Sequence, residues 1–308
     1  MMMRKILLML ALLYTGEGAF AACGLSIVAS DLNLEWDLTW TAPAITVQVS
    51  KTDPGPCTFG LGFSKGGAGS YVRGASGAGG SLRYNVYQNS GLSHVLKDVP
   101  DITSTNDVVM ITLPPGNSPR NEFYYFDIPY AAATSPSLIP AGLYTDSFII
   151  NAYEGSDPTA FVNPPAVSTP VNVKIMVPKM ISLALVDTGG VFQDSATTKS
   201  IDFGNLSSGL ISRFDLRVRT NAGYSATVQS TNNGRLKHVS KNSYVDYSLY
   251  VNNVQADPTG ASPVLTGSGQ TGLNGIGFPV KIVIGTLGKL PLSGTYKDTV
   301  IITVTVTD

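Results

Sequence analysis

The chain has 308 residues and is nearly neutral, with 20 lysines and arginines against 21 aspartates and glutamates. That balance gives no basis for a nucleic-acid contact or a polybasic membrane contact. The length favours two domains, and abundant glycine with only 13% charged residues is typical of exported all-β proteins with many turns.

The N-terminus has the pattern of a signal peptide. Arg4 and Lys5 precede an apolar run at 6–13 that is too short to span a bilayer, and a small-x-small cleavage site ends at Ala21. We therefore expect residues 1–21 to be removed and the protein to be exported. Lipidation at Cys23 is the alternative.

The chain contains two cysteines, Cys23 and Cys57. In an exported protein this predicts a disulfide, which would close a loop of about 35 residues and contribute about 3–4 kcal/mol. A metal pair or a catalytic thiol lacks support, because His94 and His238 lie near no other expected ligand. We expect no catalytic residues, no metal, no cofactor and no enzymatic activity.

After Cys23 the pattern is short strands and turns, with no convincing helix. The strands expected in the first half are 23–29, 31–40, 45–49, 58–63, 82–87, 108–113, 123–130 and 143–153. The glycine-rich segment 65–80 lacks the Gly-Lys-Ser/Thr ending of a phosphate loop, so we expect a solvated loop there. Trp36 and Trp40 are expected to be core residues rather than binding groups.

The second half of the chain repeats the first. Residues 144–150 read YTDSFII and 296–302 read YKDTVII, while 81–89 read SLRYNVYQN and 244–252 read YVDYSLYVN. The repeat predicts two copies of one β-rich module, which we place at 22–178 and 179–308.

The two modules are expected to end differently. Residues 171–177 alternate apolar and polar side chains, which predicts a strand that completes the first module in cis. No such strand follows 294–308, so we expect the second module to keep an open edge. The residues expected to line that edge are Tyr296, Val300, Ile302, Val304 and Val306.

The Leu-x-Tyr-x-x-Tyr pattern at 82–87 and the Gly-x-Tyr-x-Asp strands at 142–146 and 294–298 resemble the spore coat protein U domain. That domain builds subunits of archaic chaperone–usher pili. The Asp-Phe-Gly turn of the pattern is present at 202–204, but the first module departs from it at 31–40. The second module also lacks the usual cysteine pair.

The resemblance implies two tandem immunoglobulin-like β-sandwiches, the second lacking its final strand. It implies three partners: a periplasmic chaperone, an outer-membrane usher, and the donor strand of the next subunit, which fills the gap. After cleavage only Ala22 would precede Cys23, so we expect no donor arm and a position at the extracellular pilus tip. The alternative is that 24–33 is the arm of a shaft subunit.

A tip subunit would attach to a host or abiotic surface and promote biofilm formation. Apolar loop residues are the candidate contacts: Leu92, Val95, Leu96, Val99, Leu138, Ala160, Phe161 and Val162. The alternative is that these residues fold back as local core. Two other functions stay open: a secreted coat protein without a pilus, and a lectin-like adhesin that stacks sugars on tyrosines such as Tyr71, Tyr124 and Tyr125.

Overall fold

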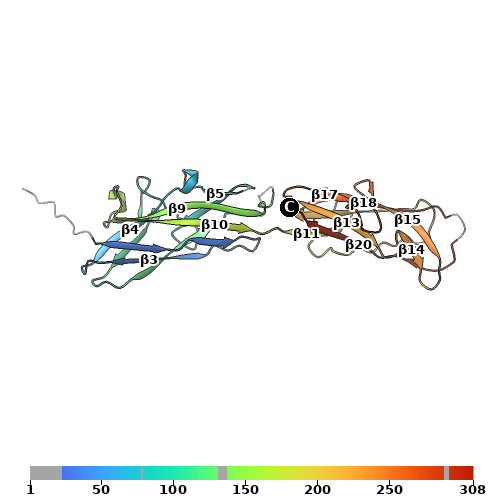
Figure 1. Cartoon of the computed structure of the whole chain (residues 1–308), viewed down its shortest axis with the longest axis horizontal. Coiled ribbons are helices and arrows are strands. Elements are labelled where there is room, and N and C mark those ends of the chain that lie inside the picture. Colours follow the sequence, from blue (N-terminus) through green and yellow to red (C-terminus); the bar gives the residue numbers. More distant parts are fainter. Residues whose placement is uncertain (1–22, 78, 131–136, 288–290, 308) are drawn as a thin grey trace, which may run out of the picture.

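The computed structural model describes residues 23–77, 79–130, 137–287 and 291–307. The described chain consists of strands with three short 3-10 turns, and the expected all-β class is confirmed. It forms two units that lie end to end, each with its own hydrophobic core (Figure 1). The predicted signal peptide lies outside the described residues. None of the helical segments in the described ranges could cross a membrane.

The first unit contains ten strands. They are β1 (Leu25–Ala29), β2 (Leu32–Glu35), β3 (Ala44–Lys51), β4 (Cys57–Phe63), β5 (Arg73–Gly77), β6 (Gly80–Tyr87), β7 (Val109–Leu113), β8 (Arg120–Asp127), β9 (Gly142–Glu154) and β10 (Val167–Val177). The 3-10 turns are η1 (Gly66–Ala68), η2 (Thr105–Asp107) and η3 (Pro158–Ala160).

These strands fold over one core. On one side the order is β1-β3-β8-β6, and on the other β9 pairs with β4, β5 and β10, while β10 also pairs with β2. Because β5 pairs with both β6 and β9, it joins the two sides into one continuous sheet. Along β10 the inward residues alternate with outward ones, as the period-two pattern requires.

The second unit also contains ten strands. They are β11 (Ile181–Val186), β12 (Ile211–Thr220), β13 (Tyr224–Ser230), β14 (Arg235–His238), β15 (Tyr244–Val251), β16 (Val254–Gln255), β17 (Leu265–Gly267), β18 (Ile276–Ile284), β19 (Tyr296–Lys297) and β20 (Val300–Val306). One sheet has the order β11-β12-β18-β15-β14-β19, and β16 pairs with β15. The other has the order β17-β13-β20.

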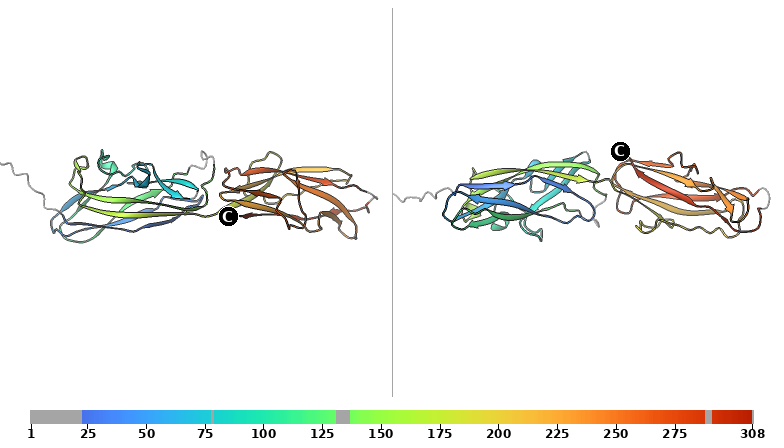
Figure 2. Two further views of the ribbon diagram at one scale, coloured as in Figure 1. Left: turned by 45° about the horizontal axis from the view of Figure 1, so that its top comes forward. Right: turned by 60° about the horizontal axis from the view of Figure 1, so that its bottom comes forward.

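A short segment after β10 joins the units, and Asn221 holds it in place. The Asn221 side chain accepts from the Met180 N–H at 2.7 Å and donates to the Pro178 carbonyl at 2.9 Å. The main-chain carbonyl of Asn221 accepts from the Ala141 N–H at 3.0 Å. Asn221 is buried, so these bonds are shielded from water. Figure 2 shows the same end-to-end arrangement from two further directions.

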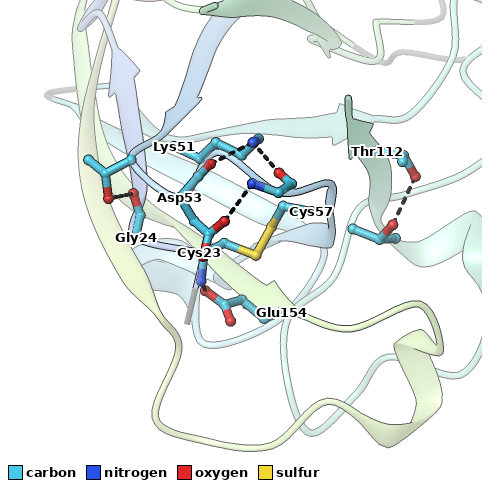
Figure 3. Close-up of a disulfide and its surroundings, with 10 residues drawn as sticks. Cys23, Gly24, Lys51, Asp53, Cys57, Thr112 and Glu154 are labelled. Atoms are coloured by element: carbon cyan, nitrogen blue, oxygen red, sulfur yellow. Dashed lines mark hydrogen bonds between the residues drawn. A yellow bond between two sulfur atoms is a disulfide. The ribbon is translucent and has the colours of Figure 1, made fainter. Parts of the chain in front are cut away.

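The predicted disulfide between Cys23 and Cys57 is confirmed. It lies at the end of the first unit remote from the second, where the Cys23 N–H donates to Glu154 at 2.8 Å (Figure 3). Beside it, the buried Lys51 ammonium donates to the carbonyls of Asp53 and Gly55. The Lys51 bonds close the turn between β3 and β4, and the main-chain N–H groups of Thr52 and Asp53 hold it against the start of β1 by donating to the carbonyls of Gly24 and Cys23.

Candidate functional site

A tyrosine–aspartate pair recurs in both units. The Tyr84 hydroxyl on β6 donates to Asp146 at 2.7 Å, and the Tyr247 hydroxyl on β15 donates to Asp298 at 2.6 Å. Burial, together with the neighbouring carboxylate, raises the pKa of both phenols, so each hydroxyl stays protonated as a donor. The two pairs therefore mark equivalent positions in the two units.

A second tyrosine explains the repeated Gly-x-Tyr-x-Asp sequence. The Tyr144 hydroxyl donates to the Pro140 carbonyl at 2.9 Å, and the Tyr296 hydroxyl donates to the Leu292 carbonyl at 2.9 Å. In both cases the acceptor lies four residues upstream, which is the tyrosine-corner arrangement of immunoglobulin-type sandwiches. The repeat thus preserves a tyrosine corner at the start of β9 in the first unit and on β19, just before β20, in the second.

In the first unit, β9 is paired along both edges. β4 and β5 lie on one edge, and β10 runs antiparallel along the other, from the pair Val167–Ala152 to the pair Val177–Gly142. The far side of β10 is closed by β2, and the Thr169 hydroxyl donates to a carbonyl of β1 at 3.1 Å. The inward side chains of β9 and β10 are consequently buried, as Phe148, Ile150 and Val173 illustrate.

In the second unit, β20 is paired along one edge only. β13 runs antiparallel to it, from the pair Tyr224–Val306 to the pair Ser230–Val300. Among the described residues no strand pairs with the other edge. The inward residues of β20 are half-buried, unlike their counterparts on β9. They are Val300, Ile302, Val304 and Val306.

The opposite wall of this opening is also apolar. Among the described strands β11 pairs only with β12, and its residues Ile181, Leu183 and Leu185 are half-buried against the same core. Ile201 and Phe203 contact that core from the segment between β11 and β12, in which no strand is assigned. We use the name open edge for the unpaired edge of β20 together with the half-buried residues of β11, β20 and the 201–203 segment.

Three of the predicted surface contacts are core residues, which corrects the sequence interpretation. Leu96, Leu138 and Phe161 are 0%, 2% and 8% exposed. The Phe161 ring stacks on Tyr153 with centroids 5.5 Å apart, and it fits because a side chain on Gly60 would lie 2.6 Å from it. These three side chains are buried, as the alternative expectation stated for all eight.

The remaining predicted contacts are more accessible. Val162 is 73% exposed and Ala160 is exposed, on the loop between β9 and β10. Leu92, Val95 and Val99 are half-buried. Leu138 contacts the second unit instead, where its N–H donates to the Thr271 carbonyl at 2.9 Å. The preceding residues 131–136 lie outside the described residues.

The aromatic residues divide between core and surface. Trp36 is buried and packs edge-on against Tyr130, and Trp40 donates its indole N–H to Asp127 at 3.2 Å. Of the tyrosines considered for sugar stacking, Tyr124 is buried, and the Tyr71 ring is approached by Lys65 and Arg73. Tyr125 is half-buried and lies on the outward side of β8, together with Phe123, which is 50% exposed. The sequence pattern had not singled out Phe123.

Sequence reasoning also missed the buried Arg73. It lies on β5, inside the segment expected to be a solvated loop, and that part of the expectation is wrong. Its guanidinium donates to the carbonyls of Ser64, Phe63 and Leu96 at 2.8, 2.9 and 2.9 Å, and to the Asn85 side chain. Burial lowers the pKa of Arg73 to about 10, so it stays charged at neutral pH.

No family model matches the sequence, and no curated protein matches it. Among solved structures, a chain of the CsuC–CsuE chaperone–tip adhesion subunit complex from Acinetobacter baumannii is 12% identical, with TM-score 0.45, over 91% of this chain and 99% of that one. The CupB6 tip adhesin of Pseudomonas aeruginosa is 10% identical, with TM-score 0.42, over 94% and 96%. The CfaE adhesin of enterotoxigenic E. coli is 12% identical, with TM-score 0.33, over 94% and 79%. Such likenesses assign no ligand or partner to this chain.

Proposed function

We propose that the chain is a two-domain subunit of a chaperone–usher pilus and that another subunit supplies a strand to its second unit. The unpaired edge of β20, beside half-buried Ile302 and Val304, is the observation that supports this. The equivalent edge of the first unit holds β10, so the fold accepts an antiparallel strand at that place. The occupant we propose is an alternating apolar strand of the next subunit.

The free energy gained by burying a donor strand on the open edge favours a stable complex. A strand along the open edge would bury roughly four or five apolar side chains, worth about 1.5–3 kcal/mol each. The total is about 6–15 kcal/mol before the cost of ordering the strand. Since a whole domain is stable by only about 5–15 kcal/mol, the second unit would depend on this partner.

The partners follow from that dependence. A periplasmic chaperone would cover the open edge before assembly, and an outer-membrane usher would be the site where the next subunit's strand replaces it. The first unit is completed by its own β10 and would not need a second donor. We therefore place the chain at the extracellular pilus tip, with the first unit pointing outward as the adhesive part.

A self-complemented chain tests the open edge. In the first unit, residues 153–166 separate Ala152 from its partner Val167. Val304 is the residue of the second unit that corresponds to Ala152. A flexible linker of about ten residues after Asp308, followed by a copy of residues 167–177, therefore gives the same separation between Val304 and the copied strand. We expect the copy to raise the melting temperature of the second unit by about 10 °C or more.

Adjacent isoleucines on β20 provide the matched variants. In the self-complemented chain, Ile302→Asp places a carboxylate against the strand copy and should remove the gain, whereas Ile301→Asp should keep it, because Ile301 points outward and is 54% exposed. Calorimetry follows both units, and tryptophan fluorescence reports the first alone, which holds Trp36 and Trp40, the only two tryptophans. A second unit that melts equally high without the copy would contradict the proposal.

The adhesive contact is proposed at the far end of the first unit. The loop between β9 and β10 lies there, next to the disulfide and remote from the joint between the units (Figure 1). Val162 projects from it, while the buried Phe161 anchors the loop to Tyr153. An exposed apolar side chain on an anchored loop can contact an apolar surface without ordering cost.

Val162→Ser should weaken attachment of the full chain to polystyrene beads by up to about tenfold, because one valine contact is worth about 1.5 kcal/mol. Val191→Ser is the control: Val191 is 57% exposed but lies in the second unit. Equal binding by both variants would place the contact elsewhere.

A glycan array tests the lectin-like alternative. Phe123 and Tyr125 lie together on the outward side of β8, so glycan binding by the wild type that is lost in Phe123→Ala would favour that alternative.

A further inference from the structure

The two units differ in the size of the side chain that a completing strand meets. Asp146 and Asp298 mark equivalent positions, since each accepts the hydrogen bond of its unit's tyrosine. Two residues later, the first unit has Phe148 and the second has Val300. Both side chains point inward, but Phe148 is 1% exposed whereas Val300 is half-buried.

In the first unit Phe148 belongs to a cluster of three rings. Its centroid lies 6.1 Å from that of Phe63 and 6.3 Å from that of Tyr124, and the latter two lie 5.0 Å apart. The β10 residue paired with Phe148 is Val171, which is fully buried. A valine is large enough at position 171 because the three rings occupy the rest of the space.

The second unit replaces these rings by aliphatic residues. Val228 pairs with Ile302 as Phe63 pairs with Ile150 in the first unit, so Val228 stands in the place of Phe63. Two of the three ring positions are therefore smaller in the second core, with Val300 in place of Phe148 and Val228 in place of Phe63.

The third ring is replaced in the same way. The pairs Val86–Phe126 and Leu249–Ile282 occupy equivalent places, two residues after Tyr84 and Tyr247 respectively. Tyr124, the third ring of the cluster, lies two residues before Phe126 on β8, and Val280 lies two residues before Ile282 on β18. Val280 therefore stands in the place of Tyr124.

A pocket lies beside two of these smaller side chains. It has a volume of about 240 Å³, is partly open to solvent, and is lined by polar residues such as Ser230, Asp246 and Gln255 as well as by Val228, Leu249 and Val300. Two of these positions carry phenylalanines in the first unit. A larger side chain opposite Val300 would add packing contacts on the apolar side of this pocket.

We propose that the strand completing the second unit carries a large apolar side chain, leucine or phenylalanine, where it faces Val300. The first unit uses Val171 at the corresponding position. This inference rests on the proposed completion by a donor strand and specifies its chemistry: antiparallel to β20, alternating, and bulkier than β10 at this one register position.

The self-complemented chain tests the size rule. Three self-complemented chains are compared. At the position copied from Val171, one keeps valine, the second carries leucine and the third carries phenylalanine. We expect at least one larger residue to raise the melting temperature of the second unit by about 4 °C or more above the valine copy. Two enlarged variants are used because a single side-chain shape can fit poorly.

The same substitution in the first unit is the matched control. Val171→Leu in β10 itself should lower the melting temperature of the first unit, because the three rings leave no room for the added group. If the valine copy stabilises the second unit as well as or better than both larger copies, the size rule is overturned. If no copy stabilises it, the proposed strand completion fails instead.

Discussion

Val173→Asp should unfold the first unit at denaturant concentrations about 2 M lower in urea than the wild type. Val173 is fully buried on β10 and is paired in register with Asp146 on β9. The new carboxylate would lose its hydration and would lie near an existing negative charge. Introducing such a group into a core costs about 3–5 kcal/mol, and urea slopes of about 1–3 kcal/mol per molar convert that into the stated shift.

Met176→Asp is the control for this prediction. It introduces the same residue on the same strand, but Met176 points outward and is 46% exposed. Its urea midpoint should stay within a few tenths molar of the wild type, since exposed substitutions are usually neutral within about 0.5 kcal/mol. Tryptophan fluorescence is the readout because Trp36 is buried in the first unit. Similar midpoints for the two variants would mean that β10 does not complete the core.

The strands that are visible in the sequence are those with strict alternation. Along 171–177, valine and isoleucine alternate with polar or outward residues, and the structure extends this strand to Val167–Val177. The repeated Tyr-x-Asp signal was also informative. Two constraints fix those residues in both units: a local tyrosine corner holds the tyrosine, and a hydrogen bond from a tyrosine on a distant strand holds the aspartate.

Features that depend on distant segments could not be predicted. Phe161 looks like an exposed loop residue in the sequence, but it is buried because Gly60, on another strand, leaves space for its ring. Leu138 looks like a surface residue, yet it is buried and its N–H donates to the Thr271 carbonyl of the second unit. Nothing local in either sequence encodes these contacts, since burial of a loop is set by the segments that it meets.

The open edge lies between these cases. The alternation at 300–306 predicted an amphipathic strand, and the structure assigns β20 to Val300–Val306. The sequence could not show which inward residues are half-buried, because exposure depends on the neighbouring strands. The comparison of Phe148 with Val300 needed the register of both units, and it distinguishes a completed edge from an unpaired one.

The buried Arg73 carries the second large expected effect. Arg73 is 0% exposed, and its partners are three main-chain carbonyls and the Asn85 side chain. Replacing a buried charged residue by an apolar one can be neutral when its partner is replaced too. Here the carbonyls of Ser64, Phe63 and Leu96 remain, and a methionine could not hydrogen-bond to them.

Arg73→Met should therefore destabilise the first unit by about 3–5 kcal/mol, since each buried acceptor left unpaired costs about 1–3 kcal/mol. Arg73→Lys should recover only part of the loss, because a single ammonium cannot reach acceptors on both sides of a planar guanidinium. Arg83→Met, on the exposed side of neighbouring β6, should change stability by no more than about 0.5 kcal/mol. Urea midpoints from tryptophan fluorescence give all three values, and equal midpoints for Arg73→Met and Arg83→Met would show that the carbonyls have found other donors.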